Sequence, residues 1–415
     1  MTKKNPVYLT VLLVALSITI TFMTTFVLTK AYSEDKQTQG IPSSMIEDVL
    51  PQKTLEKIRE IALYYAALYP DKVNTEDIEK YLIASIIAGA GDTFGNYVSA
   101  QELDSYLDSV EGNYEGIGVS VLYSAQTGLI EILQVFKDSP AEEAGILEGD
   151  LIVYVGKGEQ KQSVAEIGYY KTIELIRGDK GTYADFSVLR DGEILDFSVQ
   201  RREVENQTVS FHMYSKDSRV AVIKISKFES ATVGQFKAAM NEAKAAGAEA
   251  YVFDVRSNPG GEINAITSVL DMLLPEGPII RLEYKDEKYN KQINSDAACI
   301  DAPMAVLING STASAGELFC AALSDYNKAV LVGTNTYGKG TMQSLRQLSD
   351  GSAISITIAY YLPPFSKNYH GKGVAPDIKC DISEELKTIN INKYTDENDN
   401  QLARAVEALG LSSLQ

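Results

Sequence analysis

The sequence predicts a membrane-anchored, multidomain α/β protein, and three patterns support this fold class. An apolar segment occupies residues 7–28, short strands begin near Gly112, and strands alternate with helices from Val220 onward. Such alternation is typical of an α/β core with substantial parallel strand pairing. A chain of 415 residues exceeds a single average domain, so we expect two or three folded units.

The apolar segment at residues 7–28 is about long enough to cross a hydrocarbon core of ~30 Å as one helix. Lys3 and Lys4 precede it and acidic residues follow it, so the positive-inside rule places residues 1–6 in the cytoplasm and the folded part outside. A cleaved signal peptide is the alternative. The segment exceeds the usual apolar region of ~7–15 residues, and no clear Ala-x-Ala site follows it.

Residues 29–50 are polar and predict a linker, while residues 51–110 predict an amino-terminal helical region. From Thr54 to Ala90, apolar residues recur near helical spacing with an interruption at Pro70, which predicts two amphipathic helices. Two helices are too small to form a domain alone. We expect them to pack on the body or to pair with a second copy in a homodimer.

The composition excludes some classes of partner. A formal net charge of −18 with no visible basic face argues against binding to nucleic acid. Three cysteines are too few and too scattered for a disulfide framework, and no Cys or His cluster has the spacing of a metal site. Cys320 lies among apolar neighbours, so we expect a buried free thiol there.

A separate unit is predicted for residues 111–204. Ser139-Pro-Ala-Glu-Glu-Ala-Gly145 has a capping serine, a proline at the first helical position and a glycine suited to a left-handed helix exit. This segment resembles the signature of bacterial PDZ domains, which bind extended peptides at a strand edge and capture a terminal carboxylate with backbone amides. The resemblance assigns peptide binding to the loop at Gly116, Ile117, Gly118 and Val119.

The rest of this PDZ-like unit includes a helix predicted at residues 163–176. Part of its apolar face, with Val164, Ile167, Tyr170 and Ile173, could line a pocket for an apolar carboxy-terminal side chain, although most of these residues suit a core equally well. Arg177 follows in a turn. The family resemblance given below suggests that it couples the PDZ-like unit to the catalytic site, and an exposed turn arginine is the simpler interpretation.

Residues 205–385 predict the α/β core, and residues 386–415 predict a carboxy-terminal helical segment. Within the core, strands at 220–225, 251–255, 305–308 and 329–332 alternate with helices at 231–246, 262–273 and 314–325. Ligand sites in such sheets lie beyond the carboxyl ends of strands. Two loops stand at such ends, the segment Arg256-Ser-Asn-Pro-Gly-Gly261 and the segment that contains Ser314.

A hydroxyl nucleophile and an amine base are available in Ser311-Thr-Ala-Ser-Ala-Gly-Glu317 and Tyr337-Gly-Lys-Gly-Thr-Met-Gln343. A serine attacks only when a base removes its proton, and a lysine can be that base if burial lowers its pKa from about 10.4 to roughly 7–8. These motifs suggest Ser314 as nucleophile and Lys339 as base. Gln343 could hold the amine with a neutral hydrogen bond.

Together with the glycine-rich segment that ends at Gly261, these motifs resemble the carboxy-terminal processing peptidases, or tail-specific proteases, of peptidase family S41. The resemblance covers most of the chain after residue 50. It implies a bacterial serine peptidase with an α/β spiral fold, distantly shared with crotonases and ClpP. It also assigns the roles of nucleophile, base and orienting residue to Ser314, Lys339 and Gln343.

Peptide hydrolysis also needs donors for the oxygen that becomes negative. The amide of Ala315 suits this role because it would lie at the positive end of a helix dipole. The family supplies the second amide from its glycine pair, here Gly260 and Gly261. The alternatives are structural: Ser314 and Glu317 could form only a capping box, and the glycines only a tight turn.

The sequence therefore predicts a serine endopeptidase, anchored in the cell membrane through one helix, that cleaves proteins with apolar carboxy-terminal tails and needs no cofactor or metal. His212 and His370 occupy strand-like and loop-like surroundings, so a Ser-His mechanism is not expected. Two rival functions stay open. One is a non-catalytic PDZ scaffold, and the other is a crotonase-like enzyme that acts on acyl thioesters.

Overall fold

The computed structural model describes residues 44–411, except 104–105, 108–112, 125–126 and 297. The membrane anchor predicted at residues 7–28 lies outside the described residues. Among the helices that the structure describes, none is both long and apolar enough to cross a bilayer. The chain divides into two compact units, residues 1–82 and residues 83–415, which are described separately below.

In the first unit, two helices occupy the region where the apolar spacing predicts them. After the short helix α2 (Ser44–Val49), α3 spans Gln52–Leu68 and α4 spans Thr75–Gly89, with the unit boundary inside α4. Neither α3 nor α4 contains a buried residue. Several large apolar side chains of these helices are exposed, including Ile61, Leu63, Tyr65 and Leu68 of α3.

The core of the second unit is a six-stranded sheet in the order β10-β11-β12-β15-β16-β19. β10 is antiparallel to β11, and every other neighbouring pair in this sheet is parallel. The parallel pairing that the strand and helix alternation predicts is therefore present. The strands are Val209–Met213, Val220–Ile225, Ala250–Asp254, Met304–Ile308, Ala329–Gly333 and Ile378–Lys379.

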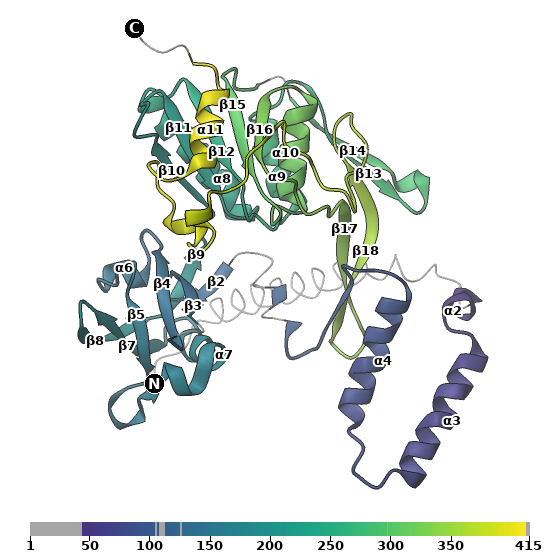
Figure 1. The fold of residues 1–415 in the computed structure, drawn as a ribbon. Coiled ribbons are helices and arrows are strands. Elements are labelled where there is room, and N and C mark those ends of the chain that lie inside the picture. Colours follow the sequence, from purple (N-terminus) through teal and green to yellow (C-terminus); the bar gives the residue numbers. More distant parts are fainter. Residues whose placement is uncertain (1–43, 104–105, 108–112, 125–126, 297, 412–415) are drawn as a thin grey trace, which may run out of the picture. The chain divides into compact units, whose positions relative to one another are not determined.

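Helices cover both faces of this sheet (Figure 1). The helices α8 (Ser230–Ala245), α9 (Ile263–Asp271) and α10 (Ala315–Asp325) pack in one apolar cluster with Ile223, whereas α11 (Asn400–Ala408) packs in another with Val222. Alternate residues of a strand point to opposite faces, so a strand buried on both sides needs a continuous apolar run. The sequence Val220–Ile225 has that character.

A second sheet has the order β1-β18-β13-β14, with β17 also paired to β18. Its strands are Asn96–Val98, Ala353–Leu362, Gly277–Tyr284, Lys291–Ser295 and Thr341–Gln347. The region 51–110, predicted as helical with two helices between Thr54 and Ala90, also contains the strand β1. Residues 96–98 form this strand because Val98 packs with Leu103 and Ala353 in a small separate core.

Residues 113–205 form what we call the middle module, which contains a sheet in the order β3-β4-β5-β7-β8 and a two-stranded β2-β9 ribbon. The predicted helix becomes α7 (Val164–Ile176), interrupted by Gly168 at φ 74°. Val164 belongs to the module's core, as the structural interpretation expected. The other elements are β2 (Asn113–Gly116), β3 (Val119–Ser124), β4 (Leu129–Val135), α6 (Pro140–Glu143), β5 (Leu151–Val155), β6 (Gln162–Ser163), β7 (Tyr183–Arg190), β8 (Glu193–Gln200) and β9 (Arg202–Glu205).

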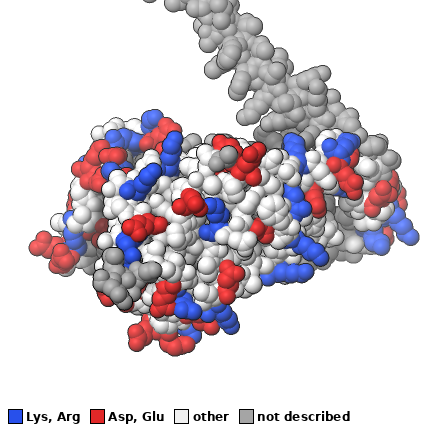
Figure 2. Space-filling model, turned by 90° about the horizontal axis from the view of Figure 1, so that it is seen from above, with Lys and Arg blue, Asp and Glu red and all other residues white. Residues whose placement is uncertain are grey.

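On the face that Figure 2 shows, Lys and Arg side chains stand among Asp and Glu side chains. The net charge of −18 is therefore not gathered into a single-sign patch on this face.

Candidate active site

Ser314 occupies the turn between β15 and α10, directly before the first helical residue, Ala315. Its backbone has φ 54° and ψ −119°, an unusual conformation for a residue with a Cβ. Strain of this kind costs of order 1–3 kcal/mol and is found at functional sites. Thr312 holds the turn, because its side chain donates to the Val255 carbonyl (2.8 Å) and its carbonyl accepts from Tyr337 N–H (3.0 Å).

Glu317 connects the serine segment to the lysine segment. Its carboxylate is fully buried and accepts hydrogen bonds from the backbone N–H of Ser314 (3.0 Å) and of Lys339 (2.7 Å). It also accepts from Gly338 N–H and from the Thr336 hydroxyl, both at 2.6 Å. The capping interaction that the Ser-x-x-Glu spacing predicts is therefore present, and the same carboxylate brings the two predicted catalytic segments together.

Two buried tyrosines contact Ser314. The Tyr361 phenol lies 3.0 Å from Ser314 Oγ and 2.7 Å from the Lys339 carbonyl oxygen, and the Tyr369 phenol donates to the Ser314 carbonyl (3.2 Å). Burial raises the pKa of both phenols, so they stay protonated at neutral pH. A carbonyl can only accept, and a phenol has one proton. Whenever Tyr361 donates to Lys339, Ser314 must therefore donate the proton in its bond to Tyr361.

The Lys339 side chain is partly buried, and its Nζ lies 4.9 Å from the centre of the Phe94 ring. Burial lowers the pKa of Lys339 below the usual lysine value, and the Asp92 carboxylate opposes this by raising it. The burial effect agrees in direction with the shift that a lysine base requires. Among the described residues, Lys339 Nζ forms no hydrogen bond with Ser314 Oγ or with Gln343.

Gln343 stands at an irregularity of the β17–β18 ladder, where the register shifts between Met342 and Gln343. Such bulges re-aim side chains near functional sites. The Gln343 Nε2 group donates to the hydroxyls of Thr341 (3.0 Å) and Thr357 (3.1 Å). The predicted hydrogen bond to Lys339 is thus not formed in this structure, although the amide oxygen of Gln343 remains as an acceptor.

The glycine-rich segment lies against the serine. A Cβ added to Gly260 would stand 2.6 Å from Ser314 Cβ and 2.9 Å from the Ala315 nitrogen, and Gly260 has φ +108°. The Gly260 backbone N–H donates to Asn258 Oδ1 (2.8 Å), so this amide already has a partner. The amides of Gly261 and Ala315 have no partner among the described residues. The Gly260 amide is thus occupied, and the amides of Gly261 and Ala315 remain the candidates for the predicted oxyanion hole.

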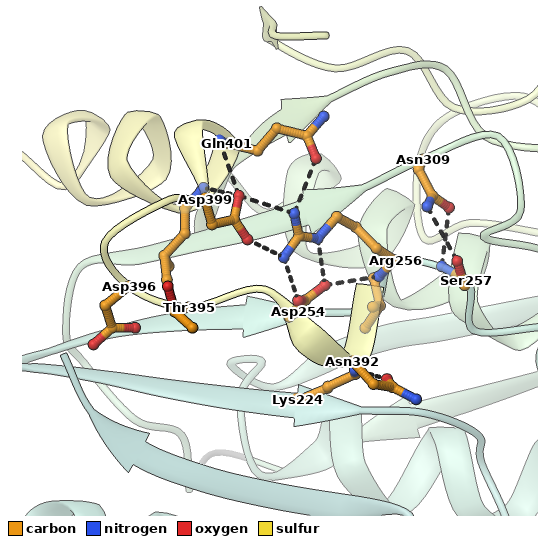
Figure 3. A network of polar contacts seen from close by, with 12 residues as sticks. Lys224, Asp254, Arg256, Ser257, Asn309, Asn392, Thr395, Asp396, Asp399 and Gln401 are labelled. Carbon is orange, nitrogen blue, oxygen red and sulfur yellow. Dashed lines mark hydrogen bonds and ion pairs between the residues drawn. The ribbon is translucent and has the colours of Figure 1, made fainter. Parts of the chain in front are cut away.

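A buried ionic network begins where this segment leaves β12 (Figure 3). Arg256 Nη2 lies 2.6 Å from Asp254 and 2.7 Å from Asp399, and its Nη1 donates to Gln401 Oε1 (3.0 Å). Burial would raise the pKa of Asp254, but the Arg256 charge and hydrogen bonds outweigh it and lower that pKa. The network joins the glycine-rich segment to the beginning of α11.

A second link in Figure 3 joins the two loops at the site. The Asn309 side chain accepts from Ser257 N–H (2.9 Å) and donates to Ser257 Oγ (3.2 Å). Ala313 N–H also donates to the Asn258 carbonyl (2.9 Å). The loop that precedes the serine and the loop that contains the glycines are therefore held as one unit.

The histidines and the buried cysteine have other surroundings. His212 pairs with Asp396 (2.8 Å) on the edge strand β10. His370 is less exposed than its loop position suggested, since its ring contacts Phe94 and Tyr360, with ring centres 6.0 and 5.7 Å apart. Cys320 is a fully buried free thiol, as predicted, and burial raises its pKa.

The middle module contains a cavity of about 300 Å³. The predicted peptide-binding loop lines it, with Ile173 of α7 and with Arg177, so these predicted residues come together. Ile117 itself is buried in the module's core at 2% exposure, and its side chain is a core residue. The coupling role of Arg177 stays a prediction. The lining residues are Glu115, Gly116, Ile117, Gly118, Val119, Ser120, Val121, Phe136, Tyr169, Ile173, Ile176, Arg177, Val204 and Asn206.

Sequence reasoning missed four neighbours of the site, namely Asp92, Phe94, Tyr361 and Tyr369. Tyr369 lies just before the glycine-rich stretch Gly371-Lys-Gly373, which is the only weak local signal for it. Asp92 and Phe94 lie about 220 or more positions before Ser314, in a stretch interpreted as helical, and no spacing rule connects them to Lys339. Asp92 and Phe94 reach the site because the chain around them pairs with β18 in the folded protein.

Comparisons with known proteins identify the family. The model of peptidase family S41 matches residues 219–380. The chain is 30% identical over 370 residues to a probable CtpA-like serine protease of Staphylococcus aureus, which covers 88% of this chain and 72% of that protein. A protein of the same description from Staphylococcus epidermidis is 29% identical over 365 residues, covering 86% and 72% of the two chains.

A solved structure described as a putative S41 protease of Bacteroides fragilis has a TM-score of 0.55 and 17% identity, and the match covers 82% of this chain and 92% of that one. At this identity the likeness concerns the fold alone. The family assignment rests on the sequence relatives and on the matching family model. The chain therefore belongs to the CtpA-like serine proteases of peptidase family S41.

Proposed function

We propose that this chain is a serine endopeptidase in which Ser314 is the nucleophile and Lys339 the general base. The observation that carries this proposal is the buried Glu317 carboxylate, which binds the backbone N–H groups of both residues and so holds them in one site. The lowered pKa of Lys339 supports it, because only the neutral amine can accept the serine proton.

In the proposed reaction, Ser314 Oγ bonds to the substrate carbonyl carbon while its proton passes to Lys339 Nζ. The carbonyl oxygen becomes negative, and the amides of Ala315 and Gly261 stabilise it. Cleavage of the C–N bond then transfers the proton from Lys339 to the leaving amine. A water molecule attacks the acyl-serine with the same proton transfers, which releases the carboxylic acid and regenerates Ser314.

This mechanism requires the Lys339 amine to reach Ser314 Oγ, and it requires the Ser314 proton to turn from Tyr361 to that amine. Catalytic hydrogen bonds are often long or unformed before substrate binds, so the resting geometry does not exclude the pair. The oxygen of Gln343, whose nitrogen is occupied by two threonines, would then accept a hydrogen bond from the resulting ammonium.

We further propose that the middle module works as a PDZ domain that captures the carboxy-terminal tail of a substrate. Support comes from the cavity, which is lined by the Gly116–Val119 loop and by the apolar side chains of Val121, Phe136 and Ile173. Gly118 has φ +82°, and a Cβ there would stand 2.3 Å from Ser139 Cβ, so only glycine fits this loop.

The remaining proposals concern the setting of the enzyme. Residues 7–28 would anchor the chain in a bacterial cell membrane, with the protease unit outside the cytoplasm. The exposed apolar side chains of α3 and α4 support a homodimer through these helices, because each helix alone leaves its apolar residues in water. Protein purified with residues 1–82 removed should then be monomeric, and a dimer of that variant would contradict the proposal.

Labelling and cleavage test the catalytic proposal. The purified chain should react with a serine-directed fluorophosphonate and cleave an unstructured peptide, and Ser314→Ala should lose both reactions while keeping its thermal unfolding temperature. Labelling without peptide cleavage would favour a different acyl substrate, which an acyl thioester assay would detect. Absence of both reactions in folded wild-type protein would favour a non-catalytic scaffold.

Tail recognition is tested by comparing a peptide that has an apolar free carboxy terminus with its amidated twin, using Ser314→Ala protein so that cleavage cannot interfere. A charge-assisted hydrogen bond is worth about 1.5–3 kcal/mol, or roughly 10- to 150-fold in affinity. Ile173→Asn is the control for the apolar wall, whereas a charge at Ile117 would disrupt the core. Equal binding of the two peptides would remove tail capture from the proposal.

A further inference from the structure

A chain of hydrogen bonds runs from Asp92 to Gln343. The Asp92 carboxylate accepts the Thr357 hydroxyl proton at Oδ1 (2.8 Å) and the Thr357 backbone N–H at Oδ2 (2.9 Å). The Gln343 amide nitrogen then donates to Thr357 Oγ1 (3.1 Å). Side chains from the turn after α4, from β18 and from β17 are thus connected.

The ionised carboxylate fixes the direction of every bond in this chain. Burial would raise the pKa of Asp92, but the hydrogen bonds from Thr357, Phe94 and Gly95 lower it overall, so the group is a pure acceptor at neutral pH. The single Thr357 proton is therefore directed to Asp92. Thr357 Oγ1 then offers only lone pairs to Gln343, which must present its NH₂ group there and keep its carbonyl oxygen for another partner.

The same carboxylate also fixes Phe94. The Phe94 backbone N–H donates to Asp92 Oδ1 (3.2 Å), which closes a tight turn. Gly95 is required in this turn, because a Cβ there would lie 2.8 Å from Ile87 Cγ2 and 2.9 Å from Asp92 Oδ2. The Phe94 ring lies 4.9 Å from Lys339 Nζ, at a distance suited to attraction between a cation and an aromatic face.

We propose that Asp92 is a positioning residue for Lys339, which acts by orienting the Gln343 carbonyl oxygen and the Phe94 ring as partners of the lysine amine. This inference rests on the proposed Ser314 and Lys339 pair. Both partners attract an ammonium more strongly than a neutral amine, so they stabilise the charge that develops when Lys339 takes the serine proton. Their orientation therefore affects the transition state more than substrate binding.

The test compares steady-state cleavage of a fluorogenic peptide by the full chain and by Asp92→Asn. An asparagine can donate to Thr357 Oγ1, which frees the threonine proton and turns Gln343 around. We expect kcat to fall about 10- to 100-fold with KM nearly unchanged, because a hydrogen bond to a charged group has that worth. The alkaline rise of kcat/KM should also move to lower pH, since losing a nearby negative charge destabilises the ammonium.

Other groups near Lys339 should not produce that shift. The Glu317 carboxylate binds the Lys339 backbone N–H, and the Tyr361 phenol binds its carbonyl, and neither group is altered in Asp92→Asn. A matched control is Asp350→Asn. Asp350 accepts from the backbone N–H (3.0 Å) and hydroxyl (2.6 Å) of Ser352 in the turn between β17 and β18, and this variant should keep both kcat and the pH profile.

Thr357 provides a second, independent pair of variants. Thr357→Val removes the hydroxyl that orients the Gln343 amide and should reproduce the loss of kcat. Thr357→Ser keeps a hydroxyl there and should retain most of the wild-type kcat. Should Asp92→Asn fail to fold, judged by its thermal unfolding, this pair decides the question. A wild-type kcat in Thr357→Val would overturn the proposal.

Failure of this inference differs from failure of the proposed mechanism. If Lys339→Ala is inactive while Asp92→Asn keeps the wild-type kcat and pH profile, Asp92 has no positioning role and the catalytic pair stands. A loss of activity in Asp92→Asn with an unshifted pH profile would indicate a purely structural role and would also overturn the inference. If folded Lys339→Ala retains cleavage, the catalytic proposal itself fails.

Discussion

The two sides of the proposed site, called here the nucleophile side and the base side, are built differently. On the nucleophile side, Ser314 stands between consecutive elements of the parallel sheet, and residues 315–323 of α10 are all buried. On the base side, Gln343 lies on β17, a largely half-exposed strand. Its supporting carboxylate, Asp92, bonds to Thr357 across 265 positions of sequence.

This difference indicates which half of the site can move. Segments with many buried contacts unfold only together with much of the protein. Half-exposed strands open at a lower free-energy cost. The proposed nucleophile and the two proposed oxyanion amides are therefore preorganised, and the surroundings of the proposed base are the adjustable part. The unformed contact between Lys339 and Ser314 agrees with this division.

The largest fall in kcat is expected from a substitution that removes the proposed base alone. Lys339→Ala should lower kcat for peptide cleavage by about 10²- to 10⁴-fold, the usual contribution of a general base, without a comparable change in thermal unfolding temperature. His212→Ala and His370→Ala should retain most of the activity, because neither ring contacts Ser314. Inactivity of a well-folded variant at either histidine would contradict the assignment of the base.

The next largest fall in kcat is expected from a substitution on the nucleophile side. Gly260→Ala places a methyl group 2.6 Å from Ser314 Cβ at φ +108°, so it should displace the serine or the neighbouring oxyanion amides. Loss of one oxyanion donor costs about 10²- to 10³-fold in kcat, which sets the expected size. Gly310→Ala is the matched control, since its Cβ would stand 3.8 Å from the nearest atom, the Asn335 carbonyl oxygen. Equal rates for the two variants would show that Gly260 has no steric role.

The same division explains what the sequence could predict. Strand and helix alternation located β11, β12, β15 and β16 within one or two residues, because buried parallel strands are continuous apolar runs. The Ser-x-x-Glu spacing identified the cap at Ser314. These signals are local, and the nucleophile side consists largely of local structure.

The base side has weaker sequence signals because its contacts join residues that are far apart in the chain. Lys339 and Gln343 were recognised through motif resemblance, but the partners of these residues were not. Tyr361 lies on β18, whose alternating pattern gives no indication of a catalytic neighbour. Asp92 and Phe94 lie in a turn that follows α4. Long-range antiparallel pairing depends on tertiary packing, which a single sequence does not encode in any short spacing.

The smallest expected effect on kcat concerns the Arg256 network, which should influence the stability of the nucleophile side and leave the pH dependence of the base unchanged. Asp399→Asn removes one of two carboxylates from a buried arginine and should lower the free energy of unfolding by about 3 kcal/mol. Asparagine still caps a helix well, so the cap of α11 is preserved. Glu407→Gln removes an exposed pair on the same helix and should cost about 0–1 kcal/mol.

The pH dependence of unfolding sharpens this test. The pKa of Asp254 is lower in the folded chain than the unfolded value of about 3.9, so its contribution to stability is complete above that pH and is lost as the pH falls through the folded pKa. Denaturant unfolding of the wild type should therefore show constant network stability from pH 5 to neutrality and a decline only in stronger acid. If Asp399→Asn costs no more than Glu407→Gln at neutral pH, the network does not stabilise the glycine-rich segment, and the nucleophile side must owe its rigidity to packing alone.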